Sequence, residues 1–396
     1  MKKIIGIGLV VLLLSAAVAG MAAAQEKAVT PAEKAEPYKV GAIFSITGPA
    51  SWLGEPERNT TLMIAEQVNA SGGINGHQLE VVIEDDVGDE TKAVTAAKKL
   101  IEKDKVLAII GPSRSGPSMA IVPILTAAQV PLVSCAAAEA IVLDDKTGEQ
   151  RAWVFKTPQK DSDAARKIFE HMKKKGIAGI AVLTSTEGFG AEGRKQLTKL
   201  APEYGIQIVA DETYGPKDTD MTPQLTKIKG TEAQAVVNWA IVPAQAIVCK
   251  NMKQLGMTIP LYQSHGFGNI KYAKAAGEAA EGTLFPCGRL LSVDSLSPDN
   301  PQKKVLAEYK AAYESRFQED VSTFGGHAYD AIWLVVGALK DAGADRKGIR
   351  DWLENKKEFI GTGGVFHFSP ADHTGLDKEA FEMLTVKGGK IVVAVD

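Results

Sequence analysis

Residues 106–116, VLAIIGPSRSG, contain the pattern that decides the fold. A short apolar run, 106–110, leads into a loop of glycine, proline and serine, and a segment with helical spacing follows. A buried strand that turns directly into a helix is the unit of a parallel sheet covered by helices. Ligands bind at the carboxyl ends of such strands. This stretch therefore predicts an architecture and a place for a site.

The same alternation of apolar runs and helical segments recurs along the chain. In the first part, strands are expected at 40–46, 79–84 and 130–134, with helices at 57–69 and 91–103. From residue 153 the pattern restarts, with strands at 153–156, 180–184, 206–211, 235–239 and 260–263 and helices at 243–255, 302–316 and 329–341. Residues 381–386 and 390–395 flank two glycines and predict a β-hairpin. We expect an α/β fold of two doubly wound parallel-sheet lobes.

The first 24 residues have the pattern of a secretory signal peptide. Lys2 and Lys3 precede an apolar run at 4–14, and three alanines precede Gln25. The apolar run is too short to favour a membrane span, and no cysteine follows the cleavage site to carry a lipid. We expect cleavage after Ala24, export to the periplasm, and a flexible leader over residues 25–37.

Composition excludes several classes of partner. Without Lys2 and Lys3 the chain has 43 basic and 48 acidic residues, a mild acidity that argues against nucleic acid. Three scattered cysteines do not make a disulfide framework or a zinc site. Buried free thiols are expected, with a Cys249–Cys287 bridge left open as an alternative. We expect a monomer with no cofactor and no metal.

Two motifs resemble those of enzymes. Residues 188–193, GFGAEG, match the dinucleotide fingerprint and would suit an exported NAD-type oxidoreductase. Against this interpretation, Glu187 would repel a pyrophosphate, and an exported enzyme meets little NAD. The loop 111–116 lacks the glycine spacing of a nucleophile elbow. It instead suggests a neutral anion cradle at a helix N-terminus, or a simple helix cap.

Several short motifs carry a family resemblance in a fixed order. They are TGP at 47–49, NASGGING at 69–76, IGPS at 110–113, VS at 133–134, FG at 189–190, YQSHG at 262–266 and AYDA at 328–331. The set resembles the periplasmic leucine/isoleucine/valine-binding protein family, the type I solute-binding receptors of ABC transporters. The resemblance covers nearly the whole mature chain.

This resemblance implies two lobes that close on a ligand by a hinge motion. Lobe 1 would comprise 38–156 and 286–364, and lobe 2 would comprise 157–285 and 365–396. The crossovers are expected near 155–157, 285–288 and 366–368. Membrane permease subunits would be the protein partners, and the receptor would not be an enzyme.

The resemblance also assigns residues to the ligand site. The hydroxyl of Ser115 and backbone groups at Ala136 would hold the ligand carboxylate. Ser113 and Arg114 in the same loop are further candidates, because arginine can meet a carboxylate bidentately. Aromatic and apolar walls would come from Trp52 or Leu53, Phe189, Trp239 and Tyr329.

Two departures from the family pattern bear on the ligand class. Ala138 stands where amino acid binders have a threonine for the ligand ammonium, and His265 stands where they have an acid. A buried ammonium without its carboxylate partner would cost several kcal/mol, whereas histidine can donate to an anion. We expect a small organic carboxylate without an α-ammonium, an aromatic or aryl-keto acid in particular. A branched-chain amino acid is the alternative.

Overall fold

The computed structural model describes residues 35–395, so the predicted signal peptide and most of the leader lie outside the described residues. Within the described part, two large sheets each have helices on both faces, which confirms the predicted α/β class. Short 3-10 helices connect several elements: η1 Gly48–Ala50, η2 Glu139–Ile141, η3 Ala201–Tyr204, η4 His265–Phe267, η5 Gly277–Ala280, η6 Arg289–Ser295 and η7 Lys378–Ala380.

The first lobe is built on a parallel sheet with strand order β2-β1-β3-β4-β5. Its strands are β1 Tyr38–Phe44, β2 Leu79–Asp85, β3 Ala108–Ile110, β4 Leu132–Ser134 and β5 Val154–Lys156. Its helices are α1 Ser51–Ala70, α2 Glu90–Glu102, α3 Ser115–Ala128, α9 Lys303–Phe317, α10 Thr323–Ala342 and α11 Arg346–Glu354.

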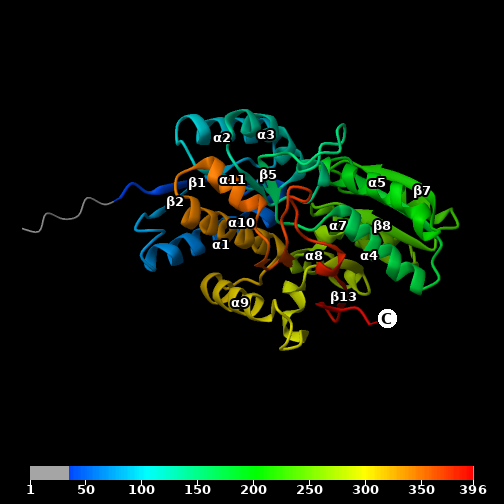
Figure 1. The fold of residues 1–396 in the computed structure, drawn as a ribbon. Helices are drawn as coiled ribbons and strands as arrows, with labels where there is room; N and C mark the ends of the chain where they lie inside the picture. The colour runs from blue at the N-terminus through cyan, green and yellow to red at the C-terminus, as the bar shows by residue number, and fades with distance from the viewer. Residues whose placement is uncertain (1–34, 396) are drawn as a thin grey trace, which may run out of the picture. The chain divides into compact units, whose positions relative to one another are not determined.

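Side chains of β1 alternate between two apolar cores. Val40 and Phe44 join the core beneath α1 and α10, whereas Ile43 joins the core beneath α2 and α3. The alternation follows from the pleat of a strand, which turns successive side chains to opposite faces. Figure 1 shows these two pairs of helices on opposite sides of the sheet.

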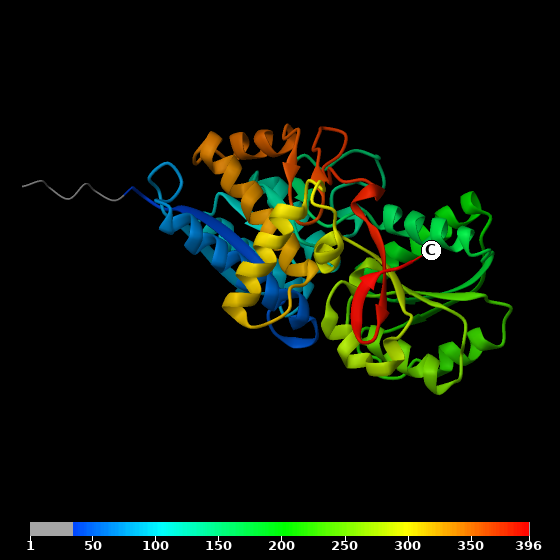
Figure 2. The ribbon, with the colours of Figure 1, turned by 90° about the horizontal axis from the view of Figure 1, so that it is seen from below.

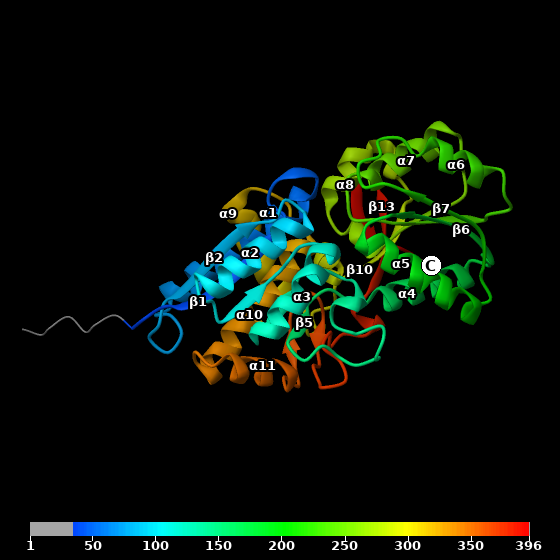
Figure 3. The same cartoon turned by 90° about the horizontal axis from the view of Figure 1, so that it is seen from above.

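The second lobe is built on a sheet with strand order β14-β13-β10-β9-β8-β6-β7. Its strands are β6 Gly179–Ser185, β7 Gln207–Tyr214, β8 Ala235–Trp239, β9 Leu261–Gln263, β10 Leu284–Cys287, β13 Glu382–Lys387 and β14 Lys390–Val393. Helices α4 Asp161–Lys174 and α5 Gly188–Leu200 cover one face, and α6 Thr222–Lys229, α7 Ala244–Gln254 and α8 Ile270–Ala276 cover the other (Figure 3). The strands β13 and β14 pair antiparallel around two glycines, which confirms the predicted hairpin (Figure 2).

The segment after α11 returns to the core of the first lobe before it enters the second. Strands β11 Phe359–Ile360 and β12 Val365–Phe366 form a small antiparallel pair. Phe368 and Leu376 pack with Phe366 in the first core, whereas Phe381 belongs to the second. We propose that the third crossover lies close to Phe381 rather than at 366–368.

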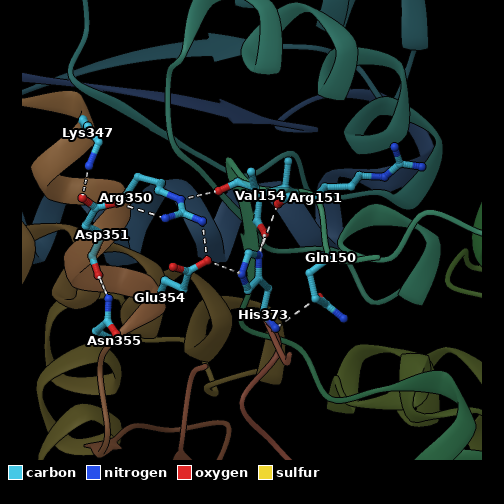
Figure 4. A network of polar contacts seen from close by, with 10 residues as sticks. Gln150, Arg151, Val154, Lys347, Arg350, Asp351, Glu354, Asn355 and His373 are labelled. Carbon is cyan, nitrogen blue, oxygen red and sulfur yellow. Dashed lines mark hydrogen bonds and ion pairs between the residues drawn. The ribbon is translucent and has the colours of Figure 1, made fainter. Parts of the chain in front are cut away.

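A buried polar network fixes this segment against β5 (Figure 4). The ring of His373 contacts the carbonyl oxygens of Val154 at 2.9 Å and Arg151 at 3.2 Å through Nδ1, and Glu354 at 3.3 Å through Nε2. Arg350 pairs with the same Glu354 from one turn earlier in α11. The network joins α11, β5 and the segment around His373.

The three cysteines are buried and free, as expected from their spacing. Among residues 35–395, none of the helices combines the length and the apolarity that crossing a membrane requires.

Candidate ligand-binding site

Ser115 is the first residue of α3, at the carboxyl end of β3. Its Oγ accepts a hydrogen bond from the backbone N–H of Ala138 at 3.3 Å. The hydroxyl hydrogen remains available, because a serine hydroxyl can accept and donate at once. The structure therefore brings Ser115 and Ala138 together, with Ser115 able to donate to an anion.

The backbone N–H of Ala136 and the hydroxyl of Ser113 already have hydrogen-bond partners within the first lobe. The N–H of Ala136 donates to Ser134 Oγ at 3.1 Å, so this backbone donor is occupied. Ser113 Oγ donates to the buried Glu57 and accepts from the N–H of Ser45 at 2.9 Å. Because both hydrogen-bonding roles of the Ser113 hydroxyl are filled inside the lobe, we propose that Ser113 does not contact the ligand.

Arg114 joins the two lobes. It forms an ion pair with Glu187, which precedes α5 in the second lobe, and donates to the carbonyl of Gly88 at 3.1 Å. A cavity of about 150 Å³ lies beside this pair, lined by Arg114 and Ser115 on one side and by Phe189 and Ile241 on the other. The guanidinium of Arg114 is thus paired with the carboxylate of Glu187, and this ion pair links the first lobe to the second.

His265 lies inside a box of aromatic rings. Ser264, which follows β9, caps η4 and places His265 at the start of this short helix. Three rings surround the imidazole with centroids 5.2 to 5.7 Å away, namely Phe189, Trp239 and Phe381. The side chain is only 7 % exposed, yet neither ring nitrogen has a partner within residues 35–395. Buried polar groups are nearly always paired, so these nitrogens point to a ligand.

The surroundings of His265 keep its imidazole neutral. Burial is the largest effect and holds the pKa of His265 well below 6.5, and the positive charge of Lys156 lowers this pKa further. A neutral imidazole still offers one N–H to an anion. An incoming carboxylate would raise the pKa again, because an opposite charge favours the protonated form.

Sequence reasoning missed three buried polar residues near His265 and Trp239. Lys156 ends β5, and its Nζ donates to the carbonyls of Pro158 at 2.7 Å and Gln159 at 3.1 Å. Asp161 begins α4, and its Oδ1 accepts from Trp239 Nε1 at 3.3 Å. Burial lowers the pKa of Lys156 and raises that of Asp161, while the attraction between them opposes both shifts. His327 in α10 is the third. The available signal was Lys156 itself, which follows the apolar residues of the first expected crossover. A lysine in such a strand is expected to be paired, because lysine is almost never fully buried unless it has a partner.

The apolar wall of the site combines both lobes. Leu53 and Phe324 from the first lobe pack into the same cluster as Phe189 and Trp239 from the second. Trp52 meets the Tyr272 ring edge-on at 5.3 Å, and its carbonyl accepts from Asn269 at 3.1 Å. The candidates Trp52, Leu53, Phe189 and Trp239 therefore lie where the lobes meet.

Tyr329 does not join this group. The helix α10 begins at Thr323, so Tyr329 lies in its second turn rather than at its start. Its ring lies 4.9 Å from Tyr309 and 6.2 Å from Trp333, within the first core. Because its ring packs against the first core, we propose that Tyr329 does not contact the ligand.

The fingerprint at 188–193 is explained by packing. A Cβ added to Gly188 would lie 3.0 Å from the backbone of Gly116. A Cβ on Gly190 would lie 2.0 Å from the carbonyl oxygen of Ser185, and a Cβ on Gly193 would lie 2.2 Å from the indole of Trp239. These glycines allow α5 to approach β8 and the first lobe closely. The neighbouring Glu187 carries a negative charge toward Arg114, where a nucleotide phosphate would have to sit.

Two α/β lobes with a cavity lined by residues of both are typical of a binding protein. Comparisons with known proteins agree. The sequence profile of the periplasmic binding protein family matches residues 37–390. The chain belongs to this periplasmic binding protein family.

Named relatives are binding proteins and receptors. A leucine-, isoleucine-, valine-, threonine- and alanine-binding protein of Pseudomonas aeruginosa is 27 % identical over 353 residues, 88 % of this chain and 90 % of its own length. An extracellular ligand-binding receptor of Rhodopseudomonas palustris is 30 % identical with a TM-score of 0.83, covering 91 % of this chain and 100 % of the other. The isoleucine-bound LivJ of Streptococcus pneumoniae is 27 % identical with a TM-score of 0.78, covering 90 % and 97 % of the two chains.

Proposed function

We propose that this protein is the solute-binding receptor of an ABC importer, and that it captures a small organic carboxylate without an α-ammonium. After cleavage behind Ala24 the receptor would work in the periplasm as a monomer and deliver its ligand to membrane permease subunits. Aromatic and aryl-keto acids are the favoured ligands.

The unpaired imidazole of His265 is the observation that carries the ligand class. The positive charge of Lys156 acts on His265 and favours an anion over an ammonium. Ser115 has a hydroxyl hydrogen to donate, and Ala138 offers only a methyl group where an ammonium would need an acceptor. The aromatic rings around His265 suit a planar ligand, because stacked or edge-on rings gain about 0.5–1.5 kcal/mol beyond their burial.

A branched-chain amino acid remains the second candidate, and Asp161 supports it. Its Oδ2 is buried without a partner within residues 35–395 and could accept from a ligand ammonium. The names of the Pseudomonas and Streptococcus relatives also favour this ligand class.

Calorimetry with matched ligands separates the two candidates. We expect the protein spanning residues 25–396 to bind 3-phenylpropionate or phenylpyruvate more tightly than phenylalanine or leucine, because the acids bring no ammonium into the cleft. Sub-micromolar binding of leucine, with no heat from either acid, would establish the amino acid alternative. Asp161→Asn should then abolish leucine binding.

Ser115→Ala should weaken binding of the favoured acid by about 10- to 150-fold. The substitution removes a charge-assisted hydrogen bond, worth roughly 1.5–3 kcal/mol. The free protein should also lose about 1–3 kcal/mol of stability, because the buried N–H of Ala138 loses its acceptor, so a thermal melt checks that the variant is still folded. An unchanged dissociation constant would remove Ser115 from the site.

A further inference from the structure

His327 lies on the face of α10 that contacts the second lobe. Thr323 precedes it by four residues, about one helical turn, and therefore lies on the same face. Thr323 donates to the carbonyl of Gly268 through its N–H at 3.0 Å and its Oγ1 at 3.1 Å. Gly268 directly follows η4, which begins with His265. The side chain of His327 is thus directed toward the loop that carries His265.

The ring of His327 is buried and incompletely paired. The side chain is 6 % exposed, and its Nδ1 has no hydrogen-bond partner within residues 35–395. Its backbone carbonyl accepts from Thr157 Oγ1 at 3.0 Å, which fixes this turn of the helix against the first crossover. A buried polar atom without a partner costs about 1–3 kcal/mol, and a ligand atom that completes the bond recovers this cost.

We propose that His327 binds a second polar group of the ligand, a neutral hydroxyl or keto oxygen distinct from the carboxylate at Ser115 and His265. The receptor would thereby select hydroxy or keto acids over the corresponding unsubstituted acids. This inference rests on the proposed function and specifies the ligand further.

The surroundings of His327 favour a neutral group over a second carboxylate. Burial, assisted by the charge of Lys156, lowers the pKa of His327 to about 3, so the imidazole is uncharged at neutral pH. The ammonium of Lys156 already donates to two backbone carbonyls and has Asp161 as its electrostatic partner. A second ligand carboxylate would therefore be buried without its own counter-ion, which is costly. A hydroxyl can pair with either tautomer of a neutral histidine.

The test is calorimetry with a series that shares one carbon skeleton. The probes are 3-phenylpropionate, 3-phenyllactate, phenylpyruvate and benzylmalonate, which carry hydrogen, hydroxyl, keto and carboxylate groups at the same position. 3-(4-Hydroxyphenyl)propionate places the hydroxyl at the far end instead. We expect at least one hydroxyl or keto acid to bind about tenfold or more tightly than 3-phenylpropionate. In His327→Leu this advantage should disappear, and in His327→Asn, which keeps a polar group near the position of Nδ1, part of it should remain.

His77→Leu is the matched control. His77 stacks on Tyr38 at 4.3 Å, at the start of the first sheet, and should leave all affinities unchanged. Three outcomes would overturn the inference while leaving the proposed carboxylate function intact. They are equal affinities across the series, an advantage of the hydroxyl or keto acid that survives His327→Leu, and tightest binding of benzylmalonate. Binding of leucine or phenylalanine alone, or of no compound in the two panels, would overturn both.

Discussion

His265→Glu should abolish binding of the carboxylate ligand, with a loss of at least about 100-fold in affinity. The wild-type imidazole can donate to the ligand, whereas a glutamate in the same aromatic box would place a second negative charge beside it. Two like charges about 4 Å apart repel by roughly 4 kcal/mol at the effective dielectric of a protein, equivalent to nearly a thousandfold. The rings of Phe189 and Trp239 keep water from screening this repulsion.

His265→Gln is the control for this substitution. Glutamine is neutral and can still donate a hydrogen bond, so the affinity of this variant should fall by less than about tenfold, the loss expected if one neutral hydrogen bond were removed entirely. Calorimetry would measure both variants, and a thermal melt would check that each is folded. Normal binding by His265→Glu would show that His265 belongs to the scaffold.

Binding should also be linked to protonation of His265. In the free protein the pKa of His265 lies well below 6.5, and the ligand anion should raise it. At a pH between the pKa of His265 in the free protein and its pKa in the complex, ligand binding makes His265 take up a proton. The affinity should therefore rise as the pH falls below 6.5, as long as the ligand stays ionised. Calorimetry from pH 5.5 to 8.5 in buffers of different ionisation enthalpy would detect the uptake, and flat affinity would argue against the contact.

Asp330→Ala should destabilise the fold by about 2–6 kcal/mol. The carboxylate of Asp330 accepts from the N–H groups of Thr362 at 2.6 Å and Gly363 at 2.7 Å, and from Thr362 Oγ1 at 3.1 Å. It thereby holds the segment after β11 against α10. Removing the carboxylate leaves two buried N–H groups unsatisfied, each costing about 1–3 kcal/mol. Urea unfolding would measure the difference, and a change below 1 kcal/mol would contradict this role.

The same residue predicts a pH dependence with a definite sign. Burial raises the pKa of Asp330 to about 7, above its value in the unfolded chain. As the pH rises, Asp330 therefore loses its proton in the unfolded chain before it does so in the folded protein. The contribution of Asp330 to stability is full below about pH 4 and is lost as the pH rises through 7. The stability of the wild type relative to Asp330→Asn should fall over this range, by up to about 1.4 kcal/mol per pH unit. The buried histidines act in the opposite direction, but they are common to both proteins and cancel in the difference. An Asn variant with the same pH profile as the wild type would refute the assignment.

The strand and helix pattern was readable from sequence because burial leaves a local periodic signature. The runs at 106–110 and 130–134 became β3 and β4, and the Gly388-Gly389 pair became the turn of the predicted hairpin. The start of α10 was not readable, because Gly325 and Gly326 suggest a helix break. Tertiary packing requires these two glycines inside the helix, since a Cβ there would meet Tyr309 Oη at 2.4 Å and Thr362 Oγ1 at 2.7 Å. The assignment of Tyr329 to the ligand site came from the family resemblance and did not depend on this boundary.

The sequence by itself determined the fold class, the family resemblance and the loops in which Ser115 and His265 lie, because these depend on local spacing and on short motifs in a fixed order. Only the tertiary structure decided which side chains remain free for a ligand. Because Glu57 and Glu187, which are distant in sequence, already pair with Ser113 and Arg114, we propose that these two residues do not contact the ligand. Asp161 and His327 each have a buried atom without a partner within residues 35–395, and we propose them as further site residues. Burial and hydrogen-bond pairing are set by contacts between segments far apart in the chain, and a single sequence does not record those contacts.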